Sequence, residues 1–134
     1  MSKKKLIRCF IALSALFVVF FVSCEVANDS LTDEEITTKV VGSWHVTEKP
    51  SGNNYQVSIA TKGSINVTIS NFYNVDVVVS ATIEEGSLII PEQLVGGYTF
   101  KGTGVFSNSY KTIQLSYSVN DGSGVENVTN TLTR

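Results

Sequence analysis

The sequence predicts an all-β domain: an eight-stranded antiparallel up-and-down barrel with a short N-terminal helix that closes one end. Three observations lead to this prediction. From about residue 44 onward, apolar and polar residues alternate, which is the period of a strand with one buried face. The breaks between the alternating runs are short and rich in Gly, Asn, Ser and Asp. Eight strands joined only by hairpin turns favour a closed barrel, because a sandwich would usually need a longer crossing connection.

The N-terminal segment has the pattern of an export signal. Four basic residues lie within the first eight positions, and residues 9–22 form an uncharged run of fourteen. That run suits the core of a signal peptide and is shorter than the ~20 apolar residues of a membrane-spanning helix. We therefore expect residues 1–23 to be a signal peptide, with a single transmembrane anchor as the alternative.

The end of this run resembles a lipobox, the recognition site of bacterial lipoprotein signal peptidase. Val22 and Ser23 fit its middle positions, and Cys24 supplies the thiol that accepts a diacylglycerol group. Two or three acyl chains on one residue would anchor the protein stably to a membrane. We expect lipidation at Cys24 and a polar tether over residues 24–31. The alternative is an ordinary secretory signal that happens to contain a cysteine.

The composition of the remaining chain excludes several classes of function. Four of the ten basic residues precede Cys24 and none of the twelve acidic ones does, so the rest carries a net charge near −6. A nucleic-acid partner would instead require a basic patch. Cys9 lies in the segment to be removed, so the mature chain has one thiol, no internal disulfide and, with a single His, no zinc set. No catalytic group surrounds His45, so we expect no enzyme activity, no cofactor and no metal.

The element expected first in the domain of residues 32–134 is a short helix. Thr32 and Glu35 have the spacing of a capping box, and the first turn is acidic, as the helix dipole favours. Ile36 and Val40 would line its buried side, and Gly42 would end it. We expect this helix to close one end of the barrel.

The eight strands follow in order, each with an apolar face. The positions on these faces are Trp44 and Val46; Tyr55, Val57 and Ile59; Ile65, Val67 and Ile69; Val77, Val79, Ala81 and Ile83; Leu88, Ile89 and Ile90; Tyr98, Phe100, Gly102, Gly104 and Phe106; Ile113, Leu115, Tyr117 and Val119; and Val128 and Leu132. At ~1.5–3 kcal/mol per large buried side chain, this core needs no disulfide. A barrel of this width is either filled by side chains or holds one small ligand.

The entry to the first strand resembles a known family. Gly42-Ser43-Trp44 is similar to the G-x-W signature of the lipocalin and calycin barrels. The resemblance implies that Trp44 plugs the closed end and that Arg134 stacks across it. Residues 42–134 also resemble small lipocalin-like lipoproteins of Bacteroidota, most visibly at residues 70–72, 90–93 and 100–104. The domain is shorter than true lipocalins and lacks their disulfide.

Two functions of different class fit these patterns. The first is an outer-membrane lipoprotein, on the periplasmic face or the cell surface, whose barrel binds a small apolar ligand. The second is a non-enzymatic accessory or inhibitor-type protein of the cell envelope, with a filled barrel and partner-binding loops. Phe72 and Tyr73 are expected in a loop, where they either contact a partner or cap the barrel mouth. Gly102 and Gly104 either leave room for a ligand or mark a bend in the strand.

Overall fold

A computed structural model describes residues 31–134, and Leu31–Arg134 forms one compact unit. Helix α2 (Asp33–Val40) precedes eight antiparallel strands that close into a barrel in chain order. The predicted up-and-down barrel is therefore confirmed. The predicted signal peptide, Cys24 and most of the predicted tether lie outside the described residues. Within residues 31–134, no helix is long and apolar enough to cross a membrane.

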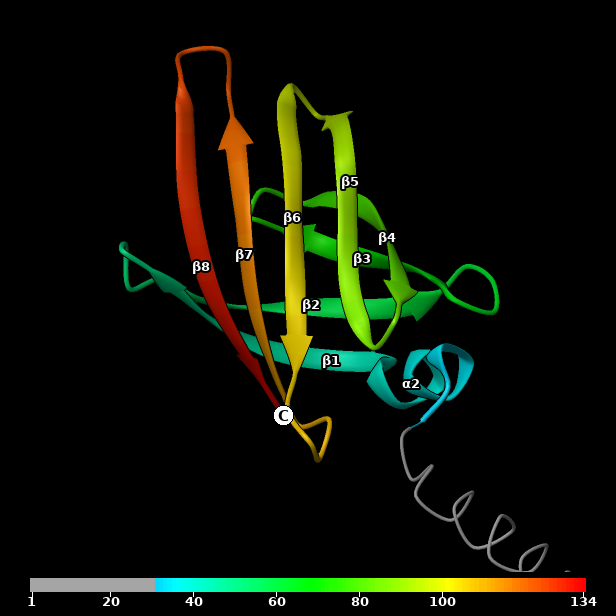
Figure 1. Ribbon diagram of the computed structural model, residues 1–134. Coiled ribbons are helices and arrows are strands. Elements are labelled where there is room, and N and C mark those ends of the chain that lie inside the picture. The colour runs from blue at the N-terminus through cyan, green and yellow to red at the C-terminus, as the bar shows by residue number, and fades with distance from the viewer. Residues whose placement is uncertain (1–30) are drawn as a thin grey trace, which may run out of the picture. The chain divides into compact units, whose positions relative to one another are not determined.

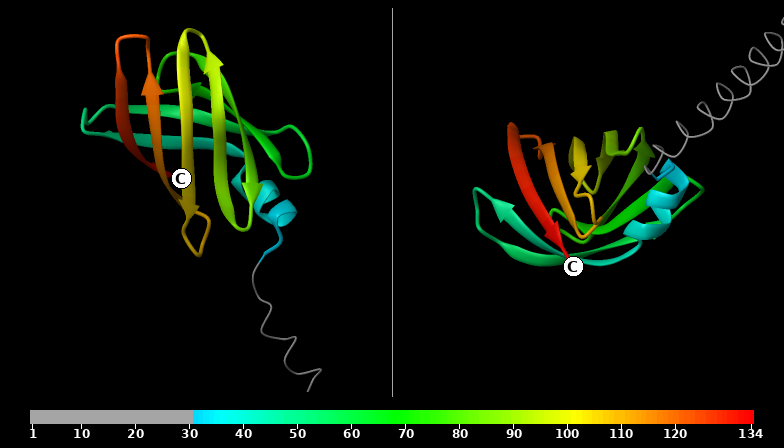
Figure 2. Two further views of the ribbon diagram at one scale, coloured as in Figure 1. Left: turned by 45° about the horizontal axis from the view of Figure 1, so that its top comes forward. Right: turned by 60° about the horizontal axis from the view of Figure 1, so that its bottom comes forward.

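Each strand pairs with its neighbours in the sequence, and β8 returns to pair with β1. The strands are β1 (Gly42–Lys49), β2 (Asn54–Thr61), β3 (Asn66–Phe72), β4 (Val77–Glu84), β5 (Ser87–Val95), β6 (Tyr98–Phe106), β7 (Thr112–Asn120) and β8 (Val125–Thr133). In Figure 1, β5–β8 stand upright in front of β1–β3, which run across behind them. Helix α2 lies at one end of the barrel, called here the closed end (Figure 2). The opposite end, called the mouth, carries the β1–β2, β3–β4, β5–β6 and β7–β8 connections.

Helix α2 begins where the capping box predicts. The Glu35 amide donates to Thr32 Oγ1 at 3.2 Å, and the Thr32 amide donates to Glu35 Oε2 at 2.9 Å. The Asp33 carboxylate accepts from the Glu85 and Gly86 amides of the β4–β5 turn at 3.0 and 2.9 Å. Ile36 and other apolar residues of α2 are buried against the strands. The cap starts the helix and Asp33 fixes it to the turn beneath it.

The barrel interior is filled mainly by the residues that the alternation predicts, together with Phe72. Nearly every inward apolar side chain is buried, and the largest of the fully buried ones are Trp44, Phe72 and Phe100. Phe72 and Phe100 meet edge to face, with ring centroids 5.0 Å apart. Aromatic pairs of this kind add to the burial of apolar area, so the middle of the barrel is a packed core.

A bulge in β3 changes which side chains face inward. The register between β3 and β4 shifts between Ser70 and Phe72, and Asn71 has a φ of 59°. Val67 and Ile69 point inward, so strict alternation would turn Phe72 outward. The extra residue at the bulge reverses the alternation and turns Phe72 into the core.

A second bulge, in β5, opens the seam between β4 and β5. The register with β6 shifts between Ile90 and Gln93, and only the part of β4 near the turn pairs with β5. The Gln93 side chain fills the gap: its Oε1 accepts from the Ser80 amide and its Nε2 donates to the Ser80 carbonyl, both at 2.8 Å. The side-chain amide thus replaces the backbone bonds that the seam lacks, and protects a strand edge.

Candidate functional site

The closed end brings Gly42, Trp44 and Arg134 together. Trp44 is 1% exposed and its Nε1 donates to the Val40 carbonyl at 2.8 Å. The Arg134 guanidinium lies 4.5 Å from the centre of the Trp44 ring and donates to the Val41 carbonyl at 2.8 Å and to the Lys39 carbonyl. Gly42 has a φ of +131°, and a Cβ there would lie 3.1 Å from Arg134 Nη1. The three residues form a structural plug at the closed end. It joins helix α2 to the first strand, β1, and to the residue that follows the last strand, β8.

The prediction that Phe72 belongs to a loop aromatic pair is wrong. Phe72 ends strand β3 and is 1% exposed, so it is not available to a partner. Tyr73 follows it in the β3–β4 connection and is half-buried. Its ring packs against those of Tyr98, Phe100 and Tyr117, with centroids 5.9–6.2 Å apart. Phe72 therefore belongs to the core, and Tyr73 packs over the core near the mouth of the barrel.

Inside the barrel, the structure leaves no room for a ligand directly in front of Gly102 and Gly104. A Cβ at Gly102 would lie 2.4 Å from the Cβ of Tyr117, so the space in front of this glycine is occupied. At Gly104 the neighbours would be Leu88 and Ile113, at 3.2 and 3.3 Å. Gly102 pairs with the last residue of β5 before its bulge. Both glycines thus permit close packing of their neighbours.

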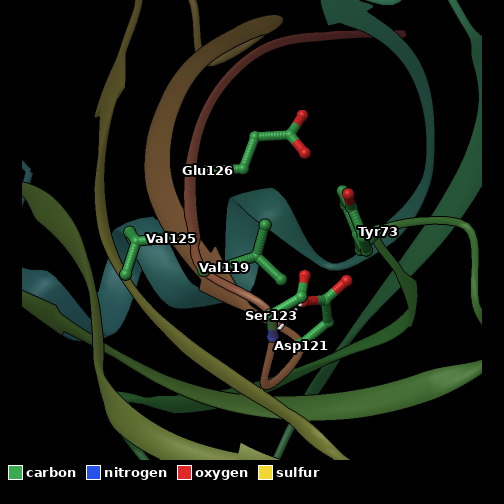
Figure 3. A pocket seen from close by; sticks show the side chains of 7 residues that line it. Tyr73, Val119, Asp121, Ser123, Val125 and Glu126 are labelled. Atoms are coloured by element: carbon green, nitrogen blue, oxygen red, sulfur yellow. Dashed lines mark hydrogen bonds between the residues drawn. The ribbon is translucent and has the colours of Figure 1, made fainter.

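The mouth of the barrel holds a pocket of about 230 Å³. It is lined by Tyr73, Val119, Asp121, Ser123, Gly124, Val125 and Glu126 (Figure 3). Glu126 reaches into the opening from β8, and Tyr73 reaches in from the β3–β4 connection. Tyr73 has a φ of 56°, a conformation that costs a non-glycine residue ~1–3 kcal/mol and that tends to occur at functional sites. The strained backbone aims the Tyr73 ring across the mouth.

A second polar feature lies inside the barrel. Glu48, Tyr55, Tyr117 and Asn130 are all buried, and we call them the inner polar cluster. Glu48 accepts from the Tyr55 hydroxyl at 3.2 Å and from the Ser51 hydroxyl at 2.8 Å. Asn130 Nδ2 donates to the Tyr55 and Tyr117 hydroxyl oxygens at 3.2 and 3.4 Å. Asn130 Oδ1 is buried and has no hydrogen-bond partner. An unpaired buried acceptor costs ~1–3 kcal/mol.

The environment raises the pKa of three tyrosine hydroxyls above its ordinary value. Burial, followed by the charge of Glu48, raises the pKa of Tyr55 to about 12. Burial is also the main reason that the pKa of Tyr117 is raised. The pKa of Tyr73 is raised by burial and then by the carboxylates of Glu126, Glu48 and Asp121. Tyr73 therefore lies within the field of carboxylates from both the mouth and the inner cluster.

The carboxylates of this region have no basic partner. Across residues 31–134 no Lys, Arg or His nitrogen lies within 4.0 Å of a carboxylate oxygen. Asp121 instead accepts from the Ser123 amide and hydroxyl at 2.9 and 2.6 Å, which lowers the pKa of its carboxyl. Lys49 follows Glu48 in sequence but is exposed, because successive residues of a strand face opposite ways. The mouth and the interior beneath it are consequently electronegative.

Sequence reasoning missed Glu48, Glu126 and Asn130 as site residues, although a signal was present. Glu48 lies an even number of positions from Trp44 and Val46, so it is on the same face of β1. Asn130 and Glu126 are related in the same way to Val128 and Leu132 of β8. A polar residue at an inward position of a barrel strand must find a partner or a ligand. The alternation of inward and outward positions could therefore have identified all three as candidate site residues.

Among residues 31–134, no three His, Cys, Asp or Glu side chains are grouped so that they could hold a metal ion. The pocket presents two carboxylates, a tyrosine ring and Val119, over a core that is closed. No protein-family model matches the chain, and neither a curated protein nor a solved structure does.

Proposed function

We propose that the protein is a non-enzymatic, lipid-anchored binding barrel of lipocalin-like type that holds a small ligand at its mouth. The mouth pocket between Tyr73 and the β7–β8 hairpin carries this proposal. The barrel below the pocket is packed with buried side chains, so a ligand site deep in the barrel has no support. A concave pocket with a few convergent polar groups is the usual form of a small-molecule site.

The chemistry of the lining changes the expected ligand. An apolar ligand would bury the Glu126 carboxylate with no cation beside it, which is costly. Val119 and the ring of Tyr73 supply apolar contact on the other walls. The ligand that fits this lining is small and combines an apolar body with polar groups.

Native mass spectrometry of the protein purified from its own membranes tests the mouth site. We expect a mass that exceeds the acylated chain by one small molecule. Tyr73→Ala should remove this added mass, because it takes away one wall of the pocket. Tyr110→Ala is a matched control: Tyr110 is also half-buried, has a φ of 57° and packs against one aromatic ring, Phe106 at 5.9 Å, at the closed end. The proposal would be contradicted if the wild-type protein had the mass of the acylated chain alone, or if the two variants changed the added mass equally.

The anchor is proposed from the lipobox-like stretch at residues 21–24, and we place the protein on the outer membrane at its periplasmic face or at the cell surface. Cys24→Ala should move the protein from the membrane fraction to the soluble fraction or leave it uncleaved, because the acyl chains have no other attachment point. Cys9→Ala should leave both fractionation and mobility unchanged, since the proposed cleavage removes the segment that contains Cys9. If the two variants behave alike, lipidation at Cys24 is wrong.

A further inference from the structure

The seam between β4 and β5 is paired at only one of its ends. β4 pairs with β5 from Thr82 to Glu84, beside the turn at the closed end. From Val77 to Ala81, β4 has no paired residue in β5, whereas β1 and β8 stay paired as far as Lys49, at the mouth. The part of the β4–β5 seam that lacks strand pairing thus lies at the mouth of the barrel.

Pro91 and the bulge in β5 explain why the pairing stops. Pro91 has no amide hydrogen, and the register with β6 shifts between Ile90 and Gln93. A pocket of about 310 Å³ lies at this point, and its lining includes Ser80 and Thr82 of β4 and Pro91 of β5. β5 therefore stands apart from β4 where the pairing ends.

Peptide groups on both sides of the seam are left without a strand partner. The Ser80 amide and carbonyl point toward β5, so those of Val78 do as well, because the peptide groups of a strand alternate in direction. The β5–β6 turn pairs Val95 with Tyr98, which leaves the peptide groups of Leu94 directed at β4. Val78 and Leu94 are 51% and 73% exposed, so nothing in residues 31–134 covers these two positions from outside.

Side-chain contacts take the place of strand pairing in this part of the seam. The Gln93 amide bonds to both Ser80 groups at 2.8 Å, and its Nε2 also donates to the Pro91 carbonyl at 3.0 Å. Gly96 of the β5–β6 turn lies against Val77, since a Cβ at Gly96 would be 2.7 Å from Val77 Cγ1. We call the Gln93 side chain the latch, because it joins the two strands where their backbones do not.

Opening of the seam would change the mouth pocket. Tyr73 immediately follows β3 and lies on the β4 side of the seam, and its ring meets that of Tyr98, on the β5–β6 side, edge to face at 5.9 Å. The Tyr73 ring also lines the mouth pocket together with residues of the β7–β8 hairpin (Figure 3). β5 is joined to that hairpin by the pairing of β5 with β6 and of β6 with β7. When β4 parts from β5, Tyr73 therefore moves away from the hairpin.

We propose that the β4–β5 seam is a gate of the mouth. Release of Ser80 by the latch lets β4 and the β3–β4 connection part from β5, and the paired residues from Thr82 to Glu84 act as the hinge. Such a local opening costs less than global unfolding, because the other seams keep their pairing. The opening stands on the structure of the seam alone, and its use for the exchange of a bound molecule rests on the proposed mouth site.

Amide hydrogen exchange of the full-length protein in non-ionic detergent tests the opening with no ligand. The latch accepts from the Ser80 amide, whereas the Val79 amide points the other way, toward β3. After correction for intrinsic rates, we expect Ser80 to exchange about a hundredfold or more faster than Val79. Equal protection of the two amides would overturn the gate, since the seam would then open only when the whole barrel unfolds.

Relaxation dispersion distinguishes opening of the seam from motion of the Gln93 side chain alone. We expect the amides of Val78 and Leu94 to show one common exchange rate, because a single opening moves both sides of the seam. Exchange that is confined to Ser80 and Gln93 would overturn the gate.

Gln93→Leu tests the latch. It removes both hydrogen bonds to Ser80 and keeps a side chain of similar size, so it should raise the open population about tenfold. Gln114→Leu is a matched control: Gln114 also accepts a side-chain hydrogen bond across two strands, from Thr131 at 3.1 Å, but β7 and β8 are paired along their whole length. Equal effects of the two variants on Val78 would exclude the latch. If Gln93→Leu fails to fold, the exchange of Ser80 in the wild-type protein decides.

The mass measured for the proposed mouth site gives a separate readout. On dialysis, Gln93→Leu should lose the added mass about tenfold faster than the wild-type protein, in line with its larger open population. An unchanged rate of loss would overturn the gate and leave the mouth site standing. Absence of the added mass from the wild-type protein would overturn the mouth site, and the exchange of Ser80 would still decide whether the seam opens.

Discussion

Trp44→Ala is expected to destabilise the barrel by about 3–5 kcal/mol, because it empties the largest fully buried site at the closed end. The variant also leaves the Val40 carbonyl without the Nε1 donor and removes the ring over which Arg134 lies. Equilibrium denaturation followed by tyrosine fluorescence measures the loss. Trp44→Phe should lose less, since a ring remains while the hydrogen bond is gone.

Two further variants make this prediction specific. Ser43→Ala, at the neighbouring position on the outer face, should change the free energy of unfolding by less than ~0.5 kcal/mol. Arg134→Lys should lower the free energy of unfolding measurably. A lysine ammonium group lacks the planar guanidinium, which donates to the Val41 and Lys39 carbonyls while it stacks on the indole. A loss below ~1 kcal/mol for Trp44→Ala would show that the plug does not hold the closed end.

Gly102→Ala is expected to destabilise the barrel by at least the ~1–3 kcal/mol typical of overpacking. The new methyl group would lie 2.5 Å from the Ser116 carbonyl oxygen and 2.4 Å from the Cβ of Tyr117. Both neighbours are fixed by the pairing of β6 with β7, so the strands themselves must move apart. The midpoint of urea denaturation should fall and the near-ultraviolet signal of Tyr117 should change.

Gly104→Ala provides the comparison for Gly102→Ala. Its methyl group would meet side-chain atoms of Leu88 and Ile113 at 3.2–3.3 Å, and such atoms can shift by a few tenths of an ångström. We therefore expect a clearly smaller loss of stability than at Gly102. Equal losses at the two positions would mean that β6 bends enough to relieve the contact with the backbone of β7.

The barrel could be predicted because most of the sequence features that specify it are local. Alternation, turn residues and the capping box each act over a few positions, and they agree with one another. The misplacement of Phe72 has an equally local cause. Asn71 and Asn74 look like loop residues on either side of the aromatic pair, but Asn71 forms a bulge that keeps Phe72 in the strand. A one-residue bulge carries almost no signal in a single sequence, yet it reverses the facing of the side chains after it.

The candidate site was harder to predict because its residues come from distant strands. Tyr73, Asp121 and Glu126 meet only when β3 and the β7–β8 hairpin share the same end of a closed barrel. The sequence also leaves open whether Gly102 and Gly104 face a void or a neighbour, because this depends on how closely the strands approach. For Gly102 that distance is set by the approach of β7, which is a tertiary property.

The contact between Arg134 and Val41 joins positions 93 apart in the sequence, nearly the whole length of the domain. Closing the barrel therefore requires one of the longest loops that the chain can form, and such nonlocal pairing slows folding. Until β8 arrives, β1 and β7 expose unpaired edges to which another chain can add. Closure should be a late and comparatively slow step, and the interval before it is the time at which this protein is most open to aggregation.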